Sequence, residues 1–412
     1  MHRPATPRAR IIATVVAFLA LAGCSSHPAS PKQQQAAHTG PAPSASTSTA
    51  TSADPTTSAP TTPAKPAARI SVSTAALNPA QPIAVQVVDG TLSSVSVSDA
   101  SGNPIAGAFS ASHTSWSSTA ALGYSSTYTV NAAARGSDGK TVQRTASVRT
   151  VTPAVTAYPS VIPAPSVSDF GVGEPIAVLF DQPVADKAAA QKALTVTSTP
   201  AQPGAWYWIS DRQVDYRPEN YWTPGTHITL QANVFGVDLG NGVYGQQNRT
   251  INYSVHDSWR AVADAADEHM VIYHNGVLVK RMAVSMGKTQ TPTHNGPHVI
   301  QMKQQNYTMN SCTYGVCSGP EAYIAQEHYV ERISNDGEFV HENPNSVAEQ
   351  GVSNVSHGCI NLNEADAIWF YNHLGVGDVV EVVNSTGPKL PLDDTWGDWE
   401  VPWSVWSAGN AG

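Results

Sequence analysis

The chain has 412 residues, a formal net charge of −9 at pH 7 and only 13% charged residues. This acidic, weakly charged composition argues against nucleic-acid binding, which selects basic surfaces. No glycine-rich phosphate loop or dinucleotide-binding fingerprint stands out, and we expect neither an organic cofactor nor a metal to be required.

The first residues have the features of a secretory signal. Arginines precede a short apolar run, residues 11–22, and small residues then lead to Cys24. The run is too short for a comfortable membrane span. The pattern within residues 1–24 predicts a bacterial lipoprotein signal with Cys24 lipidated. We therefore expect an extracytoplasmic protein anchored by lipid to the outer face of the cell membrane. An ordinary signal peptide with a chance cysteine is the alternative.

Residues 25–67 consist almost entirely of Ala, Ser, Thr, Pro and Gln. Such a segment cannot bury enough apolar surface to offset the entropy lost on ordering. We predict a disordered tether that is semi-extended by its prolines and reaches from the membrane into the cell wall.

Two segments that follow show the pattern of small β-sandwiches. In residues 68–152 and again in residues 153–256, short runs of alternating apolar residues are separated by turn residues. A period of two predicts half-buried strands, and this spacing is typical of a sandwich. Neither segment contains a cysteine or a clear acid–base cluster, so we expect spacers that position a catalytic domain.

A third domain is predicted for residues 257–385, with mixed strands and one main helix. An Asn-Gly pair between alternating strands in residues 270–279 favours a hairpin with a type I′ turn. Asn363 is placed to cap a helix over residues 364–374, whose apolar positions follow helical spacing. The tail, residues 386–412, contains four tryptophans. We expect it to pack back on this domain, because a loose tail would leave four indoles in water.

The chemistry of the chain is concentrated in residues 339–361. The segment FVH ends at His341, and residues 356–361 are SHGCIN. A thiol needs a base to become a thiolate at neutral pH, and imidazole has a suitable pKa. His341 or His357 can therefore activate Cys359 as a nucleophile. Gly358 allows the backbone turn that an oxyanion site requires.

These residues resemble the active-site signature of the L,D-transpeptidase catalytic domain, a histidine followed at a distance by Ser-His-Gly-Cys-x-Asn. Residues 286–296 look like the early strand and turn of that family, and residues 309–315 look like its active-site lid. The whole organisation is similar to actinobacterial lipoprotein members with two immunoglobulin-like domains. The resemblance thus implies a mainly β protein with two immunoglobulin-like β-sandwich domains, a β-rich catalytic domain and a tryptophan-rich extension.

The resemblance also implies roles for individual residues. Cys359 is the nucleophile, His341 the base, and the main-chain carbonyl of Glu342 orients the imidazole. The Glu342 carboxylate adds a charge that could raise the pKa of His341. His357 either shapes the site or holds the loop, and the N–H groups of Gly358 and Cys359 are the candidate oxyanion donors. The expected substrate-binding residues are Tyr323, Tyr314, Met309, Ser356 and Asn361.

With Cys24 assigned to lipid and Cys359 to chemistry, Cys312 and Cys317 remain, outside the reducing cytoplasm. A disulfide that stiffens the lid is the plain expectation. Zinc bound by these two cysteines and nearby histidines is the rival hypothesis, weakened by the missing second pair of ligands.

The expected reaction joins peptidoglycan tetrapeptide stems. The resemblance implies that a stem is held as a cysteine thioester with loss of D-alanine, and that an amine on a neighbouring stem completes a 3→3 cross-link. Carbapenem-type β-lactams would acylate Cys359. Alternatives are the same chemistry used as a carboxypeptidase or to attach proteins to peptidoglycan, a non-catalytic wall-binding lipoprotein, and a metal-dependent hydrolase. A peptidoglycan-binding surface near residues 206–208 is an alternative to burial of those aromatics in a sandwich core.

Overall fold

The computed structural model describes residues 64–394 and 396–412. The predicted signal, the lipidation site Cys24 and nearly all of the predicted tether lie outside the described residues. No helix in the described part of the chain has the length and apolar character needed to cross a bilayer.

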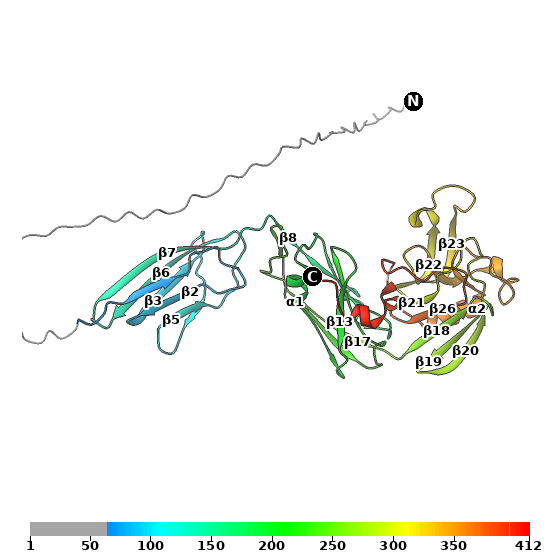
Figure 1. Cartoon of the computed structure of the whole chain (residues 1–412), viewed down its shortest axis with the longest axis horizontal. Helices are drawn as coiled ribbons and strands as arrows, with labels where there is room; N and C mark the ends of the chain where they lie inside the picture. Colours follow the sequence, from blue (N-terminus) through cyan, green and yellow to red (C-terminus); the bar gives the residue numbers. More distant parts are fainter. Residues whose placement is uncertain (1–63, 395) are drawn as a thin grey trace, which may run out of the picture. The chain divides into compact units, whose positions relative to one another are not determined.

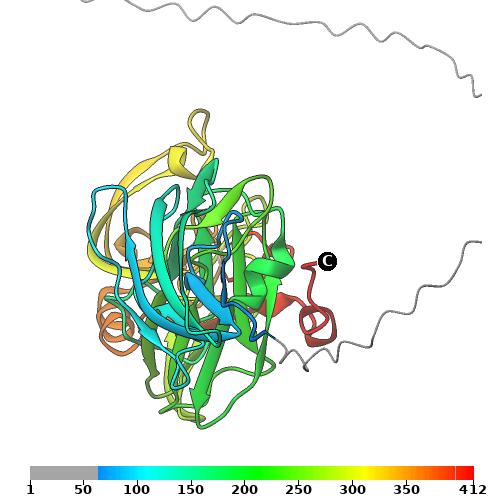
Figure 2. The same cartoon turned by 90° about the vertical axis from the view of Figure 1, so that its left-hand side faces the viewer.

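The first domain consists of two antiparallel sheets, seen from two directions in Figure 1 and Figure 2. One sheet has the order β1-β2-β5-β4 and the other the order β3-β6-β7. The strands are β1 (Arg69–Val72), β2 (Ala84–Val88), β3 (Gly90–Ser98), β4 (Gly107–Phe109), β5 (Ser115–Ser118), β6 (Thr127–Gly136) and β7 (Thr141–Arg149). Alternate residues of β6 are buried, from Tyr128 to Ala134, so period-two patterning produces this core.

The second domain also has two main sheets, with orders β10-β17-β15-β12 and β13-β14-β11-β9, and a small pair β16-β8. Its elements are β8 (Val155–Ala157), β9 (Pro159–Ile162), β10 (Asp169–Phe170), β11 (Ile176–Phe180), α1 (Lys187–Lys192), β12 (Leu194–Thr199), β13 (Gly204–Trp208), β14 (Gln213–Pro218), β15 (His227–Ala232), β16 (Val243–Gly245) and β17 (Arg249–Val255). Trp206 and Trp208 are buried in its core. Burial of these two indoles contradicts the alternative of an exposed aromatic binding surface there.

A five-stranded sheet, ordered β20-β19-β18-β26-β21, forms the base of the third domain. Its strands are β18 (Trp259–Asp264), β19 (His269–His274), β20 (Val277–Ala283), β21 (Gly296–Val299) and β26 (Val379–Val383). Positive φ angles at Asn275 and Gly276 confirm the predicted Asn-Gly turn between β19 and β20. Helix α2 (Glu364–His373) begins after Asn363, whose side chain accepts a hydrogen bond from the Asp366 N–H, as predicted.

A second sheet of the third domain, ordered β22-β23-β24-β25, positions the lid and the motif residues. Its strands are β22 (Met302–Asn310), β23 (Ile324–Arg332), β24 (Phe339–Glu342) and β25 (Ile360–Leu362). Figure 1 shows the β22–β23 hairpin projecting from the rest of this domain, and the 3-10 helix η1 (Ser311–Tyr314) follows β22. A further 3-10 helix, η2 (Pro344–Ser346), follows β24.

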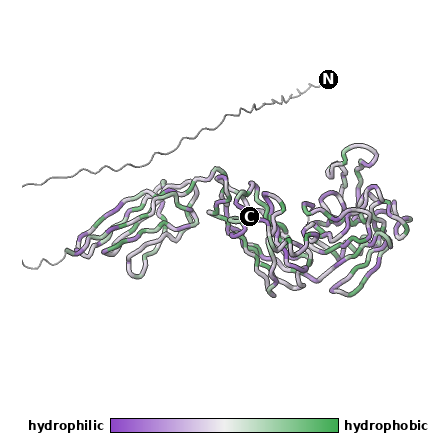
Figure 3. The backbone as a smooth tube through the Cα atoms, in the orientation of Figure 1, coloured by the Kyte–Doolittle hydropathy of each residue, from purple (hydrophilic) through white to green (hydrophobic). Residues whose placement is uncertain are grey.

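Hydrophobic and hydrophilic segments are interspersed in all three domains, as the colours of the tube in Figure 3 show. Separate apolar cores lie within the first, second and third domains. The predicted mainly β class, with immunoglobulin-like domains and a β-rich catalytic domain, is confirmed. The residue boundaries of the domains stay a prediction.

The prediction that the tail packs on the catalytic domain does not hold for its last helix. Helix α3 (Trp403–Trp406) lies on the second domain, where the Trp406 indole donates a hydrogen bond to the Ala205 carbonyl at 2.8 Å. Arg217 of β14 lies 4.5 Å from the centre of the Trp406 ring. The 3-10 helix η3 (Gly397–Glu400) precedes it, and its Trp399 donates to the Gly173 carbonyl at 2.8 Å.

The physical reason for this arrangement is a buried cation. Arg217 is only 2% exposed, and its guanidinium also lies 4.7 Å from the Trp399 ring and donates to the carbonyls of Asp398 and Val401. A buried guanidinium needs aromatic faces and carbonyl oxygens, and the tail supplies both. The part of the tail before α3 also contacts the third domain, as expected. The Leu390 N–H donates to the Asn295 carbonyl, Asp394 accepts from the Asn335 N–H, and Trp396 packs against Val299 of β21.

Trp406→Ala tests this packing. Trp406 is fully buried, so its removal should lower the free energy of unfolding by about 3–5 kcal/mol. Urea unfolding followed by circular dichroism is the measurement. Val405→Ala is the control, because Val405 is 48% exposed on the same helix. Equal unfolding midpoints for the two variants would show that the indole does not hold the tail in place.

Candidate active site

A cavity of about 340 Å³ opens beside the nucleophile motif in the third domain. It lies between the lid hairpin β22–β23 and the loop that precedes β25. The residues that line it are Met309, Tyr323, Ala325, Glu327, His341, Asn343, Asn345, Ser346, Val355, Ser356, His357, Cys359 and Asn361. Seven of the ten residues predicted for catalysis or substrate binding therefore line a single cavity.

Parallel pairing of β24 with β25 brings the thiol and the imidazole together. Val340 pairs with Ile360 and His341 pairs with Asn361, so Cys359 lies just before the strand that neighbours His341. Cys359 is a free thiol with 5% exposure, and its Sγ lies 3.6 Å from the Gly337 carbonyl oxygen. The pairing places His341 on a strand and Cys359 at the residue next to the paired strand, which limits how far the two groups can move apart.

His341 is oriented by the main chain, as expected from the resemblance. Its Nδ1 lies 2.6 Å from the carbonyl oxygen of Glu342, which requires a proton on Nδ1. That bond leaves Nε2 as the nitrogen for the thiol. The ring is only 3% exposed, so bulk water does not compete with Cys359 for it.

Glu327 is a site residue that was not predicted from the sequence. Its Oε2 lies 3.4 Å from His341 Nδ1, and its side chain is 17% exposed. The sequence did contain a sign of this role. Alternate residues of a strand point to the same face, so Glu327 shares a face with Tyr323 and Ala325, and all three line the cavity. We expected the Glu342 carboxylate to raise the pKa of His341. The carboxylate that raises it is that of Glu327.

The surroundings of His341 favour its charged form. Burial lowers its pKa, but the hydrogen bond with Cys359 and the Glu327 carboxylate outweigh burial and raise the pKa to about 10. The ordinary value is 6.5, so the stability contributed by these partners is fully present below that pH and is lost as the pH rises through about 10. At neutral pH the imidazolium of His341 therefore lies beside the Cys359 sulfur, and a neighbouring cation favours the nucleophilic form of a cysteine.

The hydroxyl group of Ser356 holds the loop before Cys359 in place. Ser356 Oγ donates to the Cys359 carbonyl at 2.6 Å and accepts the Gly358 N–H at 3.1 Å. The Gly358 N–H therefore already has an acceptor, contrary to its predicted place in the oxyanion hole, and the Cys359 N–H remains as the candidate donor. Gly358 has φ of 123°, a backbone conformation that explains the need for glycine. Ser356 acts here as a brace for the loop.

His357 is partly exposed and belongs to a polar group at the rim of the cavity. Its Nε2 bonds the Glu321 carboxylate and lies 3.4 Å from Lys288 Nζ, and its ring packs against Tyr323 at 5.6 Å. Lys288 Nζ also bonds Glu321 Oε2 at 3.0 Å. These contacts connect the lid to the motif loop, which agrees with a shaping part for His357.

The other predicted binding residues differ in where they lie. Met309 and Tyr323 line the cavity, and burial raises the pKa of the Tyr323 hydroxyl. Asn361 also lines it, and its amide donates to Ser346 Oγ of η2 at 3.1 Å. Tyr314 does not line the cavity, because its ring packs edge-on against Phe339 at 5.9 Å beneath Gly337.

The predicted Cys312–Cys317 disulfide is present, with Cα atoms 4.0 Å apart. Oxidised sulfurs cannot serve as zinc ligands, so the rival zinc hypothesis for this pair is wrong. Among the described residues, the group with metal-ligand spacing is His294, Asp336 and Glu338, which lies outside the cavity lining.

Known families match most of the described chain. The bacterial Ig domain family matches residues 74–238, and the L,D-transpeptidase catalytic domain family matches residues 258–382. L,D-transpeptidase 2 of Mycobacterium tuberculosis is 42% identical over 331 residues, which cover 80% of this chain and 81% of that relative. The chain belongs to the L,D-transpeptidase family.

Other members of this family are similar to the chain over shorter or more divergent stretches. L,D-transpeptidase 5 of Mycobacterium tuberculosis is 34% identical over 80% of this chain and 73% of its own length. A solved structure of an L,D-transpeptidase in complex with imipenem is 31% identical and covers 54% of this chain and 97% of that chain, with a TM-score of 0.48.

Glu327→Gln tests whether this carboxylate keeps His341 charged. The variant preserves the shape of the side chain but removes its charge, so the pKa of His341 should fall by about one pH unit. Titration of the ring nitrogens by NMR with ¹⁵N-labelled histidine measures that pKa, and His341→Gln identifies the signal.

Glu342→Gln is the matched control for this titration. It removes a second carboxylate next to His341 but keeps the main-chain carbonyl that bonds Nδ1. Its titration midpoint should equal that of the unsubstituted protein. If Glu342→Gln lowers the midpoint as much as Glu327→Gln, the effect of Glu327 is not specific.

Proposed function

We propose that this member of the L,D-transpeptidase family joins peptidoglycan stem peptides through a thioester on Cys359. The observation that carries the proposal is the buried Cys359, which lines one cavity of about 340 Å³ together with a His341 ring that the Glu342 carbonyl orients. A wall-binding protein without activity has no use for a thiol activated in this way. This contrast favours the enzyme over the non-catalytic alternative.

In the first half of the proposed reaction, the donor stem loses D-alanine. The Cys359 thiolate attacks the carbonyl carbon of the bond to the terminal D-alanine, and the Cys359 N–H is placed to stabilise the oxyanion. The carbon–nitrogen bond then breaks, and the leaving amine takes the proton of the His341 imidazolium. The acyl group remains as a thioester, which conserves the energy of the broken amide outside the membrane, where ATP is absent.

In the second half, an amine on a neighbouring stem attacks the thioester. Neutral His341 accepts the proton of this amine, and the sulfur leaves as a thiolate, so the starting ion pair is restored. Glu327 favours that proton transfer because its charge stabilises the imidazolium. The product is a 3→3 cross-link. Water in place of the amine would give a carboxypeptidase, and a protein amine would give attachment of a protein to peptidoglycan.

We also propose that the protein acts outside the cytoplasm as a lipoprotein anchored through Cys24. The support is the apolar run before Cys24 and the Cys312–Cys317 disulfide, a bond that persists in oxidising compartments. Carbapenem-type β-lactams are proposed as covalent inhibitors, because the thiolate that attacks a stem carbonyl can also open a β-lactam ring.

Intact-protein mass spectrometry with a disaccharide tetrapeptide tests the nucleophile and the donor together. We expect an adduct on Cys359 equal to the stem minus D-alanine, and none on Cys359→Ala. A second tetrapeptide added as acceptor should discharge the adduct into a 3→3 dimer. Discharge into free tripeptide at the same rate with and without acceptor would favour the carboxypeptidase. An adduct that persists in Cys359→Ala would overturn the proposal.

His341→Gln should slow formation of the same adduct by about 10²–10⁴-fold, because general-base catalysis by the ring is lost. The rate is measured by quenched mass spectrometry, with imipenem as a second acylating agent. His227→Ala is the control, since His227 is an exposed histidine of the second domain. An unchanged acylation rate in His341→Gln would exclude His341 as the base.

A further inference from the structure

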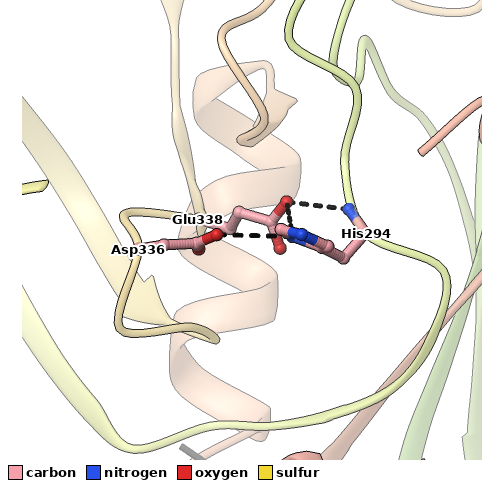
Figure 4. A group of neighbouring side chains, drawn as sticks. All are labelled: His294, Asp336 and Glu338. Atoms are coloured by element: carbon pink, nitrogen blue, oxygen red, sulfur yellow. Dashed lines mark hydrogen bonds and ion pairs between the residues drawn. The ribbon is translucent and has the colours of Figure 1, made fainter. Parts of the chain in front are cut away.

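We propose that His294, Asp336 and Glu338 form a binding site for a divalent transition-metal cation, with zinc preferred. His294 lies in the segment between β20 and β21, and the two carboxylates flank Gly337 in the turn between β23 and β24. Figure 4 shows the three side chains converging from these two segments. One ligand atom from each lies within 4.8 Å of the others.

Two of the ligand spacings are close to those around a tetrahedral ion. His294 Nδ1 lies 3.1 Å from Glu338 Oε1 and 3.5 Å from Asp336 Oδ2. Zinc binds histidine nitrogen and carboxylate oxygen at about 2.0–2.2 Å, so neighbouring ligands of a tetrahedron stand about 3.3–3.6 Å apart. One histidine and two carboxylates, with a fourth position left for water, form a ligand set that zinc accepts.

Further hydrogen bonds hold the proposed ligands in place. The other oxygen of Glu338, Oε2, lies 3.1 Å from His298 Nε2, and His298 Nδ1 lies 3.0 Å from the Gly296 carbonyl oxygen. His298 is completely buried, so its ring is fixed. The other oxygen of Asp336 accepts a hydrogen bond from the Ser334 hydroxyl. Such outer contacts orient the ligands of natural metal sites.

The cluster is largely shielded from solvent. Glu338 is only 4% exposed, and its Oε1 accepts the main-chain N–H of His294 at 2.8 Å and lies 3.1 Å from His294 Nδ1. An incoming metal must displace the proton shared in the second contact. The Asp336 side chain is 47% exposed and provides a route from solvent.

The position of the cluster suggests a structural part for the ion. Gly337, between the two carboxylates, directs its carbonyl oxygen at Cys359 Sγ. Thr293, next to His294, donates its hydroxyl proton to the Gly358 carbonyl at 2.8 Å. A bound ion would join the two segments that support the nucleophile loop from behind. It would take no part in the transfer reaction, because none of its ligands lines the cavity.

Without a metal, the same residues form a hydrogen-bonded cluster around His294, and titration with zinc separates the two possibilities. The protein is purified without a histidine tag and carries Cys359→Ala and His357→Ala, which remove donors of the active site that could bind zinc. Calorimetry with Zn²⁺ should show one site per chain. Cobalt substitution should give visible d–d absorption of a four-coordinate ion.

Variants of the ligands make the assignment specific. Asp336→Asn, on an exposed turn, and His294→Ala should each weaken zinc binding by more than about tenfold. His328→Ala is the matched control, because His328 is an exposed histidine on β23, bonded to Asn306, and should leave the affinity unchanged. Circular dichroism shows that each variant is folded.

Three results would overturn the proposal. They are the absence of binding at millimolar zinc, binding of equal strength in Asp336→Asn and His294→Ala, and loss of binding in His328→Ala. Because Cys359 is absent from the tested protein, the outcome is independent of the proposed transferase chemistry. A failed metal site would leave the thioester mechanism untouched, and a failed thioester mechanism would leave the metal site to be judged by zinc binding alone.

Discussion

The contact between the Cys359 sulfur and the His341 ring depends on the parallel pairing of β24 with β25. The pairing places His341 on β24 beside the start of β25, where Cys359 is the preceding residue, and the Glu342 carbonyl at the end of β24 then fixes the ring. A slip of one residue in this pairing would turn the His341 side chain to the opposite face of the sheet. The other parts of the site, including the Ser356 hydroxyl and the lid, are placed relative to Cys359 and His341 and so depend on the same β24–β25 register.

Local sequence was enough to predict the parts of the site that are local in the chain. Residues 356–361 contain the nucleophile and the glycine that its backbone requires, and the five-residue separation of Cys312 and Cys317 is short enough for a disulfide within one turn. The Asn-Gly hairpin and the Asn363 cap are likewise set by neighbours in sequence. The interacting residues of these features are only a few positions apart, so the geometry of the chain allows few other local conformations.

Features that depend on contacts between distant segments could not be predicted in the same way. Glu327 meets His341 only because β23 pairs with β24, and no local motif in the sequence marks that pairing. The Gly358 N–H was expected to be free, but a hydroxyl two residues away already binds it. The tail packs on the second domain because Arg217, almost two hundred positions earlier, binds it. The sequence does not show that Arg217 is buried, since the folded second domain buries it.

The association of the tail with the second domain has a practical consequence for dissecting the protein. A fragment beginning at about residue 257 would keep Trp399, Trp403 and Trp406 but lose the surface that covers them, leaving an adhesive aromatic patch. Asn410, two residues from the end of the chain, exchanges hydrogen bonds with the main chain of Trp208. A fragment meant for crystallography or inhibitor screening should therefore keep the second and third domains together, with an affinity label at the amino-terminal side.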